Sequence, residues 1–136
     1  FSEQHNAEVN NKKILVVDDD KGIRDIIKRI LEKTNLGSVQ TAENGKEAIC
    51  IIKQKTFDLI ITDYNMPLMN GFELFEQCKA IKPEIPFMFV TGCLSGTNTI
   101  EMIKKEGIVG CIYKPFNLDE VVNMVMNALY HTKALR

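Results

Sequence analysis

The chain has 136 residues, of which 45% are hydrophobic and 26% are charged, and its net charge at pH 7 is −1. The length is that of one ordinary domain, and the composition is typical of a globular protein. A charge so close to neutral argues against direct nucleic-acid binding, and no apolar run is long enough to cross a membrane. The four cysteines form no Cys-x-x-Cys pair, which favours free thiols in a reducing cytoplasm.

Two hydrophobic patterns alternate along the chain after a polar flank at residues 1–12. Short β-branched apolar runs predict strands buried on both faces, whereas apolar residues spaced three and four apart predict helices. The half-polar strand at 38–42 is expected near a sheet edge. In chain order the predicted elements are strand 14–17, a helix containing 23–31, strand 38–42, helix 46–54, strand 59–61, helix 71–80, strand 87–90, helix 97–105, strand 110–113 and a helix containing 118–129.

Five strands that alternate with five helices predict βαβ units. Short right-handed crossovers between such units give a parallel sheet covered by helices on both faces. Asp20 directly precedes the first helix and Asn117 precedes the last, so both are expected to be N-caps.

Polar residues follow four of the predicted strands. Asp18 and Asp19 follow the first strand, Asp63 the third, Thr91 the fourth and Lys114 the fifth. Because the carboxyl ends of parallel strands share one edge of the sheet, we expect these side chains to meet there. Each one alone has a purely structural explanation, as a cap, a turn hydroxyl or a solvated charge. Their coincidence at four strand ends is what predicts a site.

The predicted site has the chemistry of phosphoryl transfer. Crowded carboxylates cannot all stay ionised without a cation, and oxygen ligands without His or Cys favour Mg²⁺. A carboxylate can attack phosphorus and form an aspartyl phosphate. The lysine and the threonine hydroxyl would then contact phosphoryl oxygens, so that positioning and charge stabilisation supply the catalysis.

Four motifs resemble those of the receiver domains of bacterial two-component signalling. They are ILVVDDD at 14–20, DYNMP at 63–67 with Asn-Gly at 70–71, VTG at 90–92 and KPF at 114–116. The resemblance covers about 13–129 and predicts a receiver domain at 13–131 with a tail at 132–136. It implies a flavodoxin-like doubly wound (βα)5 fold, a three-layer sandwich whose five-stranded parallel sheet has the order 2-1-3-4-5.

The resemblance also implies a role for each site residue. Asp63 matches the phosphoacceptor. Thr91 and Lys114 match the residues that contact phosphoryl oxygens, and the Lys114–Pro115 peptide bond is expected to be cis. The expected Mg²⁺ ligands, with Mn²⁺ as a possible substitute, are Asp19, Asp63, the backbone carbonyl of Asn65 and, through water, Asp18.

Two positions depart from the family pattern. Cys111 stands where receivers usually carry an aromatic residue that moves together with the threonine. Tyr113 lies two residues further on, on the same face of the strand. Either Tyr113 or a repacking around Cys111 replaces the usual aromatic switch, or Tyr113 merely packs against a neighbouring helix. Cys93 and Asn65 match positions that tune the access of water to the phosphoryl group and hence dephosphorylation.

The resemblance implies that a phosphohistidine of a sensor histidine kinase or a histidine phosphotransfer protein phosphorylates Asp63. The signal would leave through the fourth helix, fifth strand and fifth helix, towards an output domain, a partner or a second copy. Such a protein is not a turnover enzyme, since it catalyses only its own phosphorylation and dephosphorylation. Two alternatives stay open: a pseudo-receiver that only binds partners, and a Mg²⁺-dependent phosphatase with an aspartate nucleophile.

Overall fold

The computed structural model describes residues 12–92 and 104–130. Within these ranges the elements are β1 (Lys13–Val17), α2 (Lys21–Lys33), β2 (Ser38–Ala42), α3 (Gly45–Gln54), β3 (Leu59–Asp63), α4 (Gly71–Ile81), β4 (Phe87–Thr91), β5 (Ile108–Tyr113) and α6 (Leu118–Tyr130). The helix predicted at 97–105 lies almost wholly outside the described residues, and Lys104 and Lys105 at its end are in a turn.

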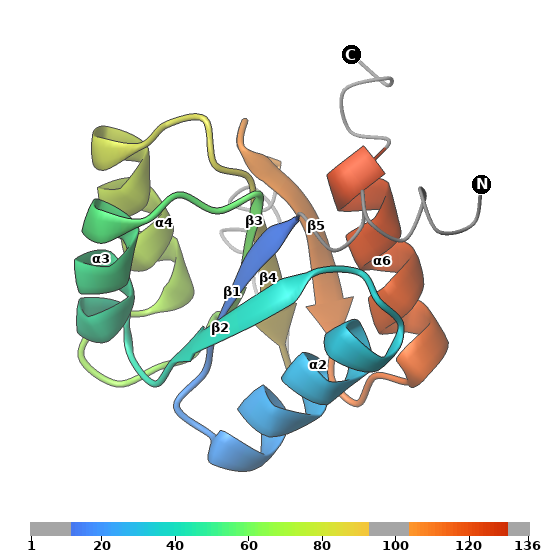
Figure 1. Ribbon diagram of the computed structural model, residues 1–136. Coiled ribbons are helices and arrows are strands. Elements are labelled where there is room, and N and C mark those ends of the chain that lie inside the picture. Colours follow the sequence, from blue (N-terminus) through green and yellow to red (C-terminus); the bar gives the residue numbers. More distant parts are fainter. Residues whose placement is uncertain (1–11, 93–103, 131–136) are drawn as a thin grey trace.

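The five strands form one parallel sheet in the order β2-β1-β3-β4-β5. Helices α3 and α4 cover one face, and α2 and α6 cover the other (Figure 1). The predicted fold class is therefore confirmed, with four helices in the described part of the chain. No helix there is both long and apolar enough to cross a bilayer.

The three central strands are almost completely buried because helices cover both of their faces. Their apolar side chains alternate between two cores. Leu15 and Ile60 face α3 and α4, for example, while Val16 and Ile61 face α2 and α6. Strand β2 is only partly buried and lies at the edge of the sheet, as its half-polar sequence predicts.

Two strands extend beyond their predicted ends into polar residues. Thr62 and Asp63 belong to β3, and Thr91 belongs to β4. Strand β5 also begins earlier than predicted, at Ile108, because Phe87 donates its backbone N–H to the carbonyl of Gly107 (2.8 Å) and so starts the pairing with β4. The register shifts by one residue between Phe87 and Met88. This shift places Thr91 opposite Tyr113, at the end of both strands.

Candidate functional site

The carboxyl ends of β1, β3, β4 and β5 lie level with one another. Val17 pairs with Thr62, Asp63 pairs with Val90, and Thr91 pairs with Tyr113. The residues that follow or end these strands therefore share one edge of the sheet. This arrangement follows from the parallel topology and brings together residues up to about a hundred positions apart in the sequence.

Three carboxylates form the centre of this edge. Asp18, Asp19 and Asp63 can each offer one oxygen such that the three atoms lie within 4.8 Å of one another. Asp18 and Asp63 are buried, with 1% and 5% of their surface exposed, whereas Asp19 is exposed. Three oxygen donors at this spacing, with one side open to solvent, suit a hard divalent cation that keeps some of its waters.

Lys114 reaches the same cluster from β5. Its Nζ lies 3.5 Å from Asp63 Oδ1 and 4.0 Å from Asp18 Oδ2. Its backbone N–H donates to the carbonyl of Thr91 (2.8 Å), which ties the end of β5 to the end of β4. The Lys114–Pro115 peptide bond is cis.

Asp18 and Asp63 are held in place by different contacts. The backbone N–H of Asp20 donates to Asp18 Oδ1 (2.9 Å), and the N–H of Asn65 donates to Asp63 Oδ1 (3.4 Å). Asp18 Oδ2, by contrast, is buried and has no hydrogen-bond partner among the described residues. A buried carboxylate oxygen of this kind normally has a partner. A cation held by Asp18, Asp19 and Asp63 would supply one, so these residues fit a metal ion.

Burial disfavours the ionised form of both Asp18 and Asp63. Burial, opposed by the hydrogen bond from Asp20 and reinforced by the negative charge of Asp63, raises the pKa of the Asp18 carboxyl from 3.8 to about 6. Burial also raises the pKa of Asp63, against the attraction of Lys114. Positive charge beyond that of Lys114 would favour the ionised form of both acids.

Asp20 does not join this cluster, because its side chain caps α2. Its Oδ1 accepts hydrogen bonds from the backbone N–H groups of Gly22 (2.8 Å) and Ile23 (3.3 Å). The predicted N-cap is confirmed. The same holds for Asn117, whose side chain accepts from the N–H of Glu120 (2.9 Å) while Glu120 accepts from that of Asn117.

The predicted switch residues lie around the end of β5. Thr91 is fully buried, and the side chains of Cys111 and Tyr113 lie close enough to influence each other's pKa. Cys111 contacts the core formed with α3 and α4, while Tyr113 stays 46% exposed. Both interpretations of Tyr113 stay predictions, because the helix predicted at 97–105 lies almost wholly outside the described residues. Cys93 lies outside the described residues.

The loop that follows Asp63 is fastened to the start of α4, and the sequence did not predict how closely. Gly71 donates its N–H to the carbonyl of Tyr64 (2.8 Å). A Cβ atom at Gly71 would lie 2.6 Å from the carbonyl oxygen of Asp63. Asn70 caps α4 and forms a capping box with Glu73. The Asn-Gly pair therefore anchors the backbone that carries Asp63.

A second residue that the sequence did not single out is Arg24. Its Nη1 donates to the backbone carbonyl of Asp18 (2.8 Å). A cation close to the start of a helix opposes the helix dipole. Because an arginine is unfavourable so close to the start of a helix, its position in the sequence could have indicated that Arg24 has a partner outside the helix.

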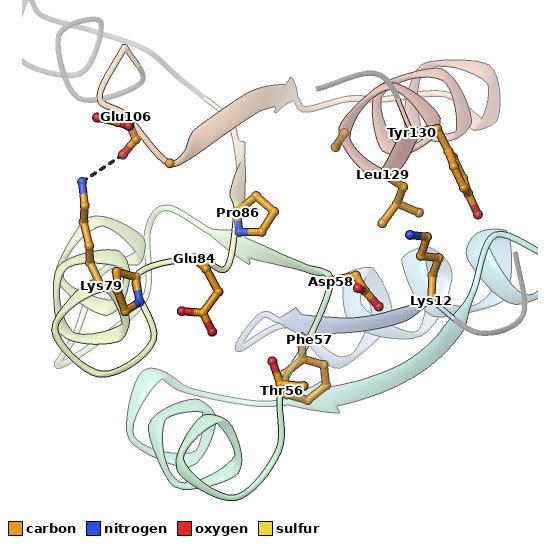
Figure 2. Close-up of a pocket in the computed structure, with 13 residues that line it drawn as sticks. Lys12, Thr56, Phe57, Asp58, Lys79, Glu84, Pro86, Glu106, Leu129 and Tyr130 are labelled. Carbon is orange, nitrogen blue, oxygen red and sulfur yellow. Dashed lines mark hydrogen bonds between the residues drawn. The ribbon is translucent and has the colours of Figure 1, made fainter. Parts of the chain in front are cut away.

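A cavity of about 800 Å³ lies at the opposite, amino-terminal edge of the sheet (Figure 2). None of the predicted site residues lines it. Both of its lysines are engaged locally: Lys79 Nζ donates to the carbonyl of Glu106 (3.1 Å), and Lys12 Nζ lies 5.3 Å from the centre of the Tyr130 ring. The clustered nucleophile, cation and acids are all at the carboxyl edge.

Comparison with known proteins agrees with this geometry. The model of the response regulator receiver domain family matches residues 14–126. Chemotaxis protein CheY-3 of Vibrio cholerae is 34% identical over 108 residues, which are 78% of this chain and 82% of CheY-3. The DNA-binding transcriptional regulator NtrC of Salmonella typhimurium is 34% identical over 118 residues, which are 87% of this chain but only 25% of NtrC.

Solved structures give the same result. A response regulator receiver domain protein from Clostridium thermocellum superposes with a TM-score of 0.81 at 30% identity, over 93% of this chain and all of that one. A CheY-like receiver domain protein from Methanospirillum hungatei gives 0.82 at 29% identity, over 92% of this chain and 98% of that one.

Proposed function

Because the chain belongs to the response regulator receiver domain family, we propose that it accepts a phosphoryl group on Asp63 and passes on the signal as a change of its surface. The observation that carries this proposal is the position of Asp63. Its carboxylate is buried at the end of a central strand, 3.5 Å from an ammonium group and beside two further acids. This set combines a nucleophile with charge stabilisation for a transferred phosphoryl group.

The proposed donor is a phosphohistidine of a histidine kinase or phosphotransfer protein. An oxygen of Asp63 attacks the phosphorus in line, the oxygen–phosphorus bond forms, and the phosphorus–nitrogen bond breaks with its electron pair going to the imidazole. Lys114, already within ion-pair distance of Asp63, neutralises one phosphoryl oxygen. The hydroxyl of Thr91 donates to another after a small movement towards the new group.

The acidic cluster would hold Mg²⁺, or Mn²⁺ in its place, through Asp19, Asp63 and the backbone carbonyl of Asn65, with Asp18 acting through water. The ion would neutralise charge that builds up on the phosphoryl oxygens. Asp18 has a second role of its own, since its Oδ1 accepts from the N–H of Asp20 and so holds the loop that presents Asp19.

We further propose that the signal leaves through β5 and the helices beside it, towards an output domain, a partner or a second copy. Thr91 and Tyr113 are paired across β4 and β5, and the side chain of Tyr113 lies beside that of Cys111. A movement of Thr91 towards the phosphoryl group would therefore shift the side chains of Tyr113 and Cys111. In this scheme the protein is a regulator that modifies itself, with Asn65 and Cys93 tuning the loss of the phosphoryl group.

The deciding experiment is intact-mass measurement after incubation with acetyl phosphate, with and without Mg²⁺, for wild type and Asp63→Asn. We expect one phosphoryl adduct that requires Mg²⁺ and is absent from the variant. A folded wild-type protein that gains no adduct, and that also fails to bind beryllofluoride, would refute phosphoryl acceptance and favour a module that only binds partners.

A further inference from the structure

Arg24 has an unusual partner for a residue at the start of a helix. The first turn of α2 contains no acidic residue, so its cations oppose the helix dipole. Lys21 is compensated within the helix by Asp25, 2.7 Å away. Arg24 instead reaches six residues back and donates from Nη1 to the backbone carbonyl of Asp18, at 2.8 Å in a partly buried position.

That carbonyl belongs to the peptide unit that joins Asp18 to Asp19. The unit is planar, so a hydrogen bond to its oxygen restrains the orientation of the whole plane. Together with the φ angle of Asp19, the orientation of the plane sets the direction in which the Cα–Cβ bond of Asp19 leaves the backbone. Arg24 therefore restrains Asp19 without touching its side chain.

Asp19 depends on this restraint more than its neighbours do. Asp18 is fixed by burial and by the N–H of Asp20 on its carboxylate (2.9 Å), and Asp63 is fixed within β3. The Asp19 side chain is exposed and makes no hydrogen bond or ion pair with the described residues. No contact with the described residues holds its carboxylate in the acidic cluster, so its place there depends on its backbone and its own rotamer.

We propose that Arg24 is a positioning residue that preorganises Asp19 as a ligand for a divalent cation. This inference rests on the metal site of the proposed function. It assigns to α2 a role in the chemistry beyond packing, because the helix that Asp20 caps also sends a side chain back to fix the acidic loop.

Charge and position have opposite consequences here, which makes the proposal testable. If Arg24 acted only as a nearby positive charge, its removal would make the cluster more attractive to Mg²⁺. If it acts by positioning Asp19, its removal weakens Mg²⁺ binding, since residues that orient metal ligands typically contribute about 10- to 100-fold to affinity. The direction of the change therefore separates the two roles.

The experiment is calorimetric titration of the whole chain with MgCl₂ at constant ionic strength, for wild type, Arg24→Met, Arg24→Lys and Lys21→Met. Lys21→Met is the matched control, because it removes one positive charge from the same helix end without touching the loop. We expect binding weakened about tenfold in Arg24→Met and by less in Arg24→Lys, which keeps a donor but not the planar fork. Lys21→Met is expected to bind as tightly as wild type or more tightly.

Unfolding of each variant in EDTA shows whether the fold is kept, and Arg24→Lys provides the comparison if Arg24→Met does not fold. Equal or tighter Mg²⁺ binding by both Arg24 variants would overturn the proposal, and so would a wild-type protein that binds no Mg²⁺. The titration involves no phosphoryl transfer. A wild type that binds Mg²⁺ but gains no phosphoryl group would refute the proposed function, while the Arg24 comparison would still decide the positioning role.

A second measurement separates positioning from a general loss of activity. In phosphorylation by acetyl phosphate, Arg24→Met should raise the Mg²⁺ concentration needed for half of the maximal rate. The rate at saturating Mg²⁺ should stay within about twofold of wild type. A fall in the saturated rate with an unchanged half-saturation point would contradict the role proposed for Arg24.

Discussion

At the scale of single residues, the site buries the carboxylate of Asp18 in a place where an apolar side chain would stabilise the fold better. Asp18 is buried with one oxygen hydrogen-bonded and the other without a hydrogen-bond partner among the described residues. Burying a carboxylate in this way costs free energy unless a positive charge is near. Lys114 Nζ, 4.0 Å from that oxygen, supplies part of this compensation. In the absence of metal, the buried carboxylate of Asp18 therefore lowers the free energy of unfolding, and the packing of the rest of the molecule must offset this cost.

The first prediction concerns the pH dependence of the metal-free protein. The pKa of Asp18 is about 6 in the folded protein and 3.8 when unfolded, so the folded state binds this proton more tightly. The resulting destabilisation is absent below about pH 4, develops between pH 4 and 6, and is complete above pH 6. Asp18→Asn should therefore stabilise the metal-free protein at pH 7 by about 3 kcal/mol.

Urea unfolding in EDTA between pH 4.5 and 7.5 tests this prediction. The two proteins should differ little at the acid end, and the difference should grow as the pH rises. A constant difference across the range would mean that the carboxylate of Asp18 is not the source of the effect.

The second prediction concerns Tyr113. Its half-exposed side chain lies beside that of Cys111, and its backbone is paired with that of Thr91 across the sheet. Tyr113→Ala should leave the yield of phosphoryl adduct unchanged but abolish the change in amide hydrogen exchange at 108–113 that beryllofluoride causes in wild type. Leu118→Ala, which also truncates an exposed apolar side chain, is the control. If Tyr113→Ala responds as wild type does, Tyr113 is not the switch residue.

At the scale of elements, the site residues are positioned by two strand-to-helix connections, one from β1 to α2 and one from β3 to α4. Strand β1 leads through the acidic loop into α2, where Asp20 caps the helix and Arg24 returns to the carbonyl of Asp18. Strand β3 leads into α4, where the backbone of Gly71 lies close to that of Asp63. Both helices thus hold the strand ends before them in place, which is how a rigid framework positions side chains to within fractions of an ångström.

The third prediction tests the second connection. A Cβ at residue 71 would lie 2.6 Å from the carbonyl oxygen of Asp63 and 3.0 Å from the Cα of Tyr64, and backbone atoms cannot easily move aside. Gly71→Ala should therefore destabilise the protein by about 1–3 kcal/mol and slow phosphorylation of Asp63.

Gly92→Ala is the matched control for Gly71→Ala, because residue 92 directly follows Thr91 and a Cβ there would meet no atom of the described residues within 4 Å. Denaturant unfolding and intact-mass kinetics on both variants provide the measurement. Equal effects of the two substitutions would contradict the steric explanation.

At the scale of the whole molecule, the sheet and the site depend on each other. Four strands must lie in register for their ends to form one cluster, and two cores on opposite faces hold that register. A ligand that bridges the strand ends should in turn stabilise the entire fold, since it binds the folded state and not the dispersed residues of the unfolded chain.

The fourth prediction follows from this linkage. Mg²⁺ at a hundred times its dissociation constant should raise the free energy of unfolding by about 2.7 kcal/mol. Asp19→Asn should lose most of this gain, because it removes the exposed carboxylate of the cluster. Thermal unfolding in MgCl₂ and in NaCl of equal ionic strength measures the effect. The same stabilisation by both salts would show that it reflects general screening.

The central strands could be predicted from the sequence because burial on both faces requires nearly continuous apolar residues, as in 14–17, 59–61 and 87–90. Their carboxyl-terminal ends were underestimated. Thr62, Asp63 and Thr91 are polar but buried within strands, since the site and not the core occupies that edge. The start of β5 was placed too late because the hydrogen bond that begins its pairing with β4, from the N–H of Phe87 to the carbonyl of Gly107, is a long-range contact.

The fold class, the alternation of elements and the chemical types that meet at one edge of the sheet can be inferred from the sequence, because local periodicity and the rule for parallel strand ends are enough. The distances among the three carboxylates and Lys114, the close approach of Gly71 to Asp63, and the hydrogen bond from Arg24 to the carbonyl of Asp18 depend on the tertiary structure. The physical reason is that these contacts depend on how helices settle on the sheet. That arrangement results from packing over the whole molecule, which no local pattern records.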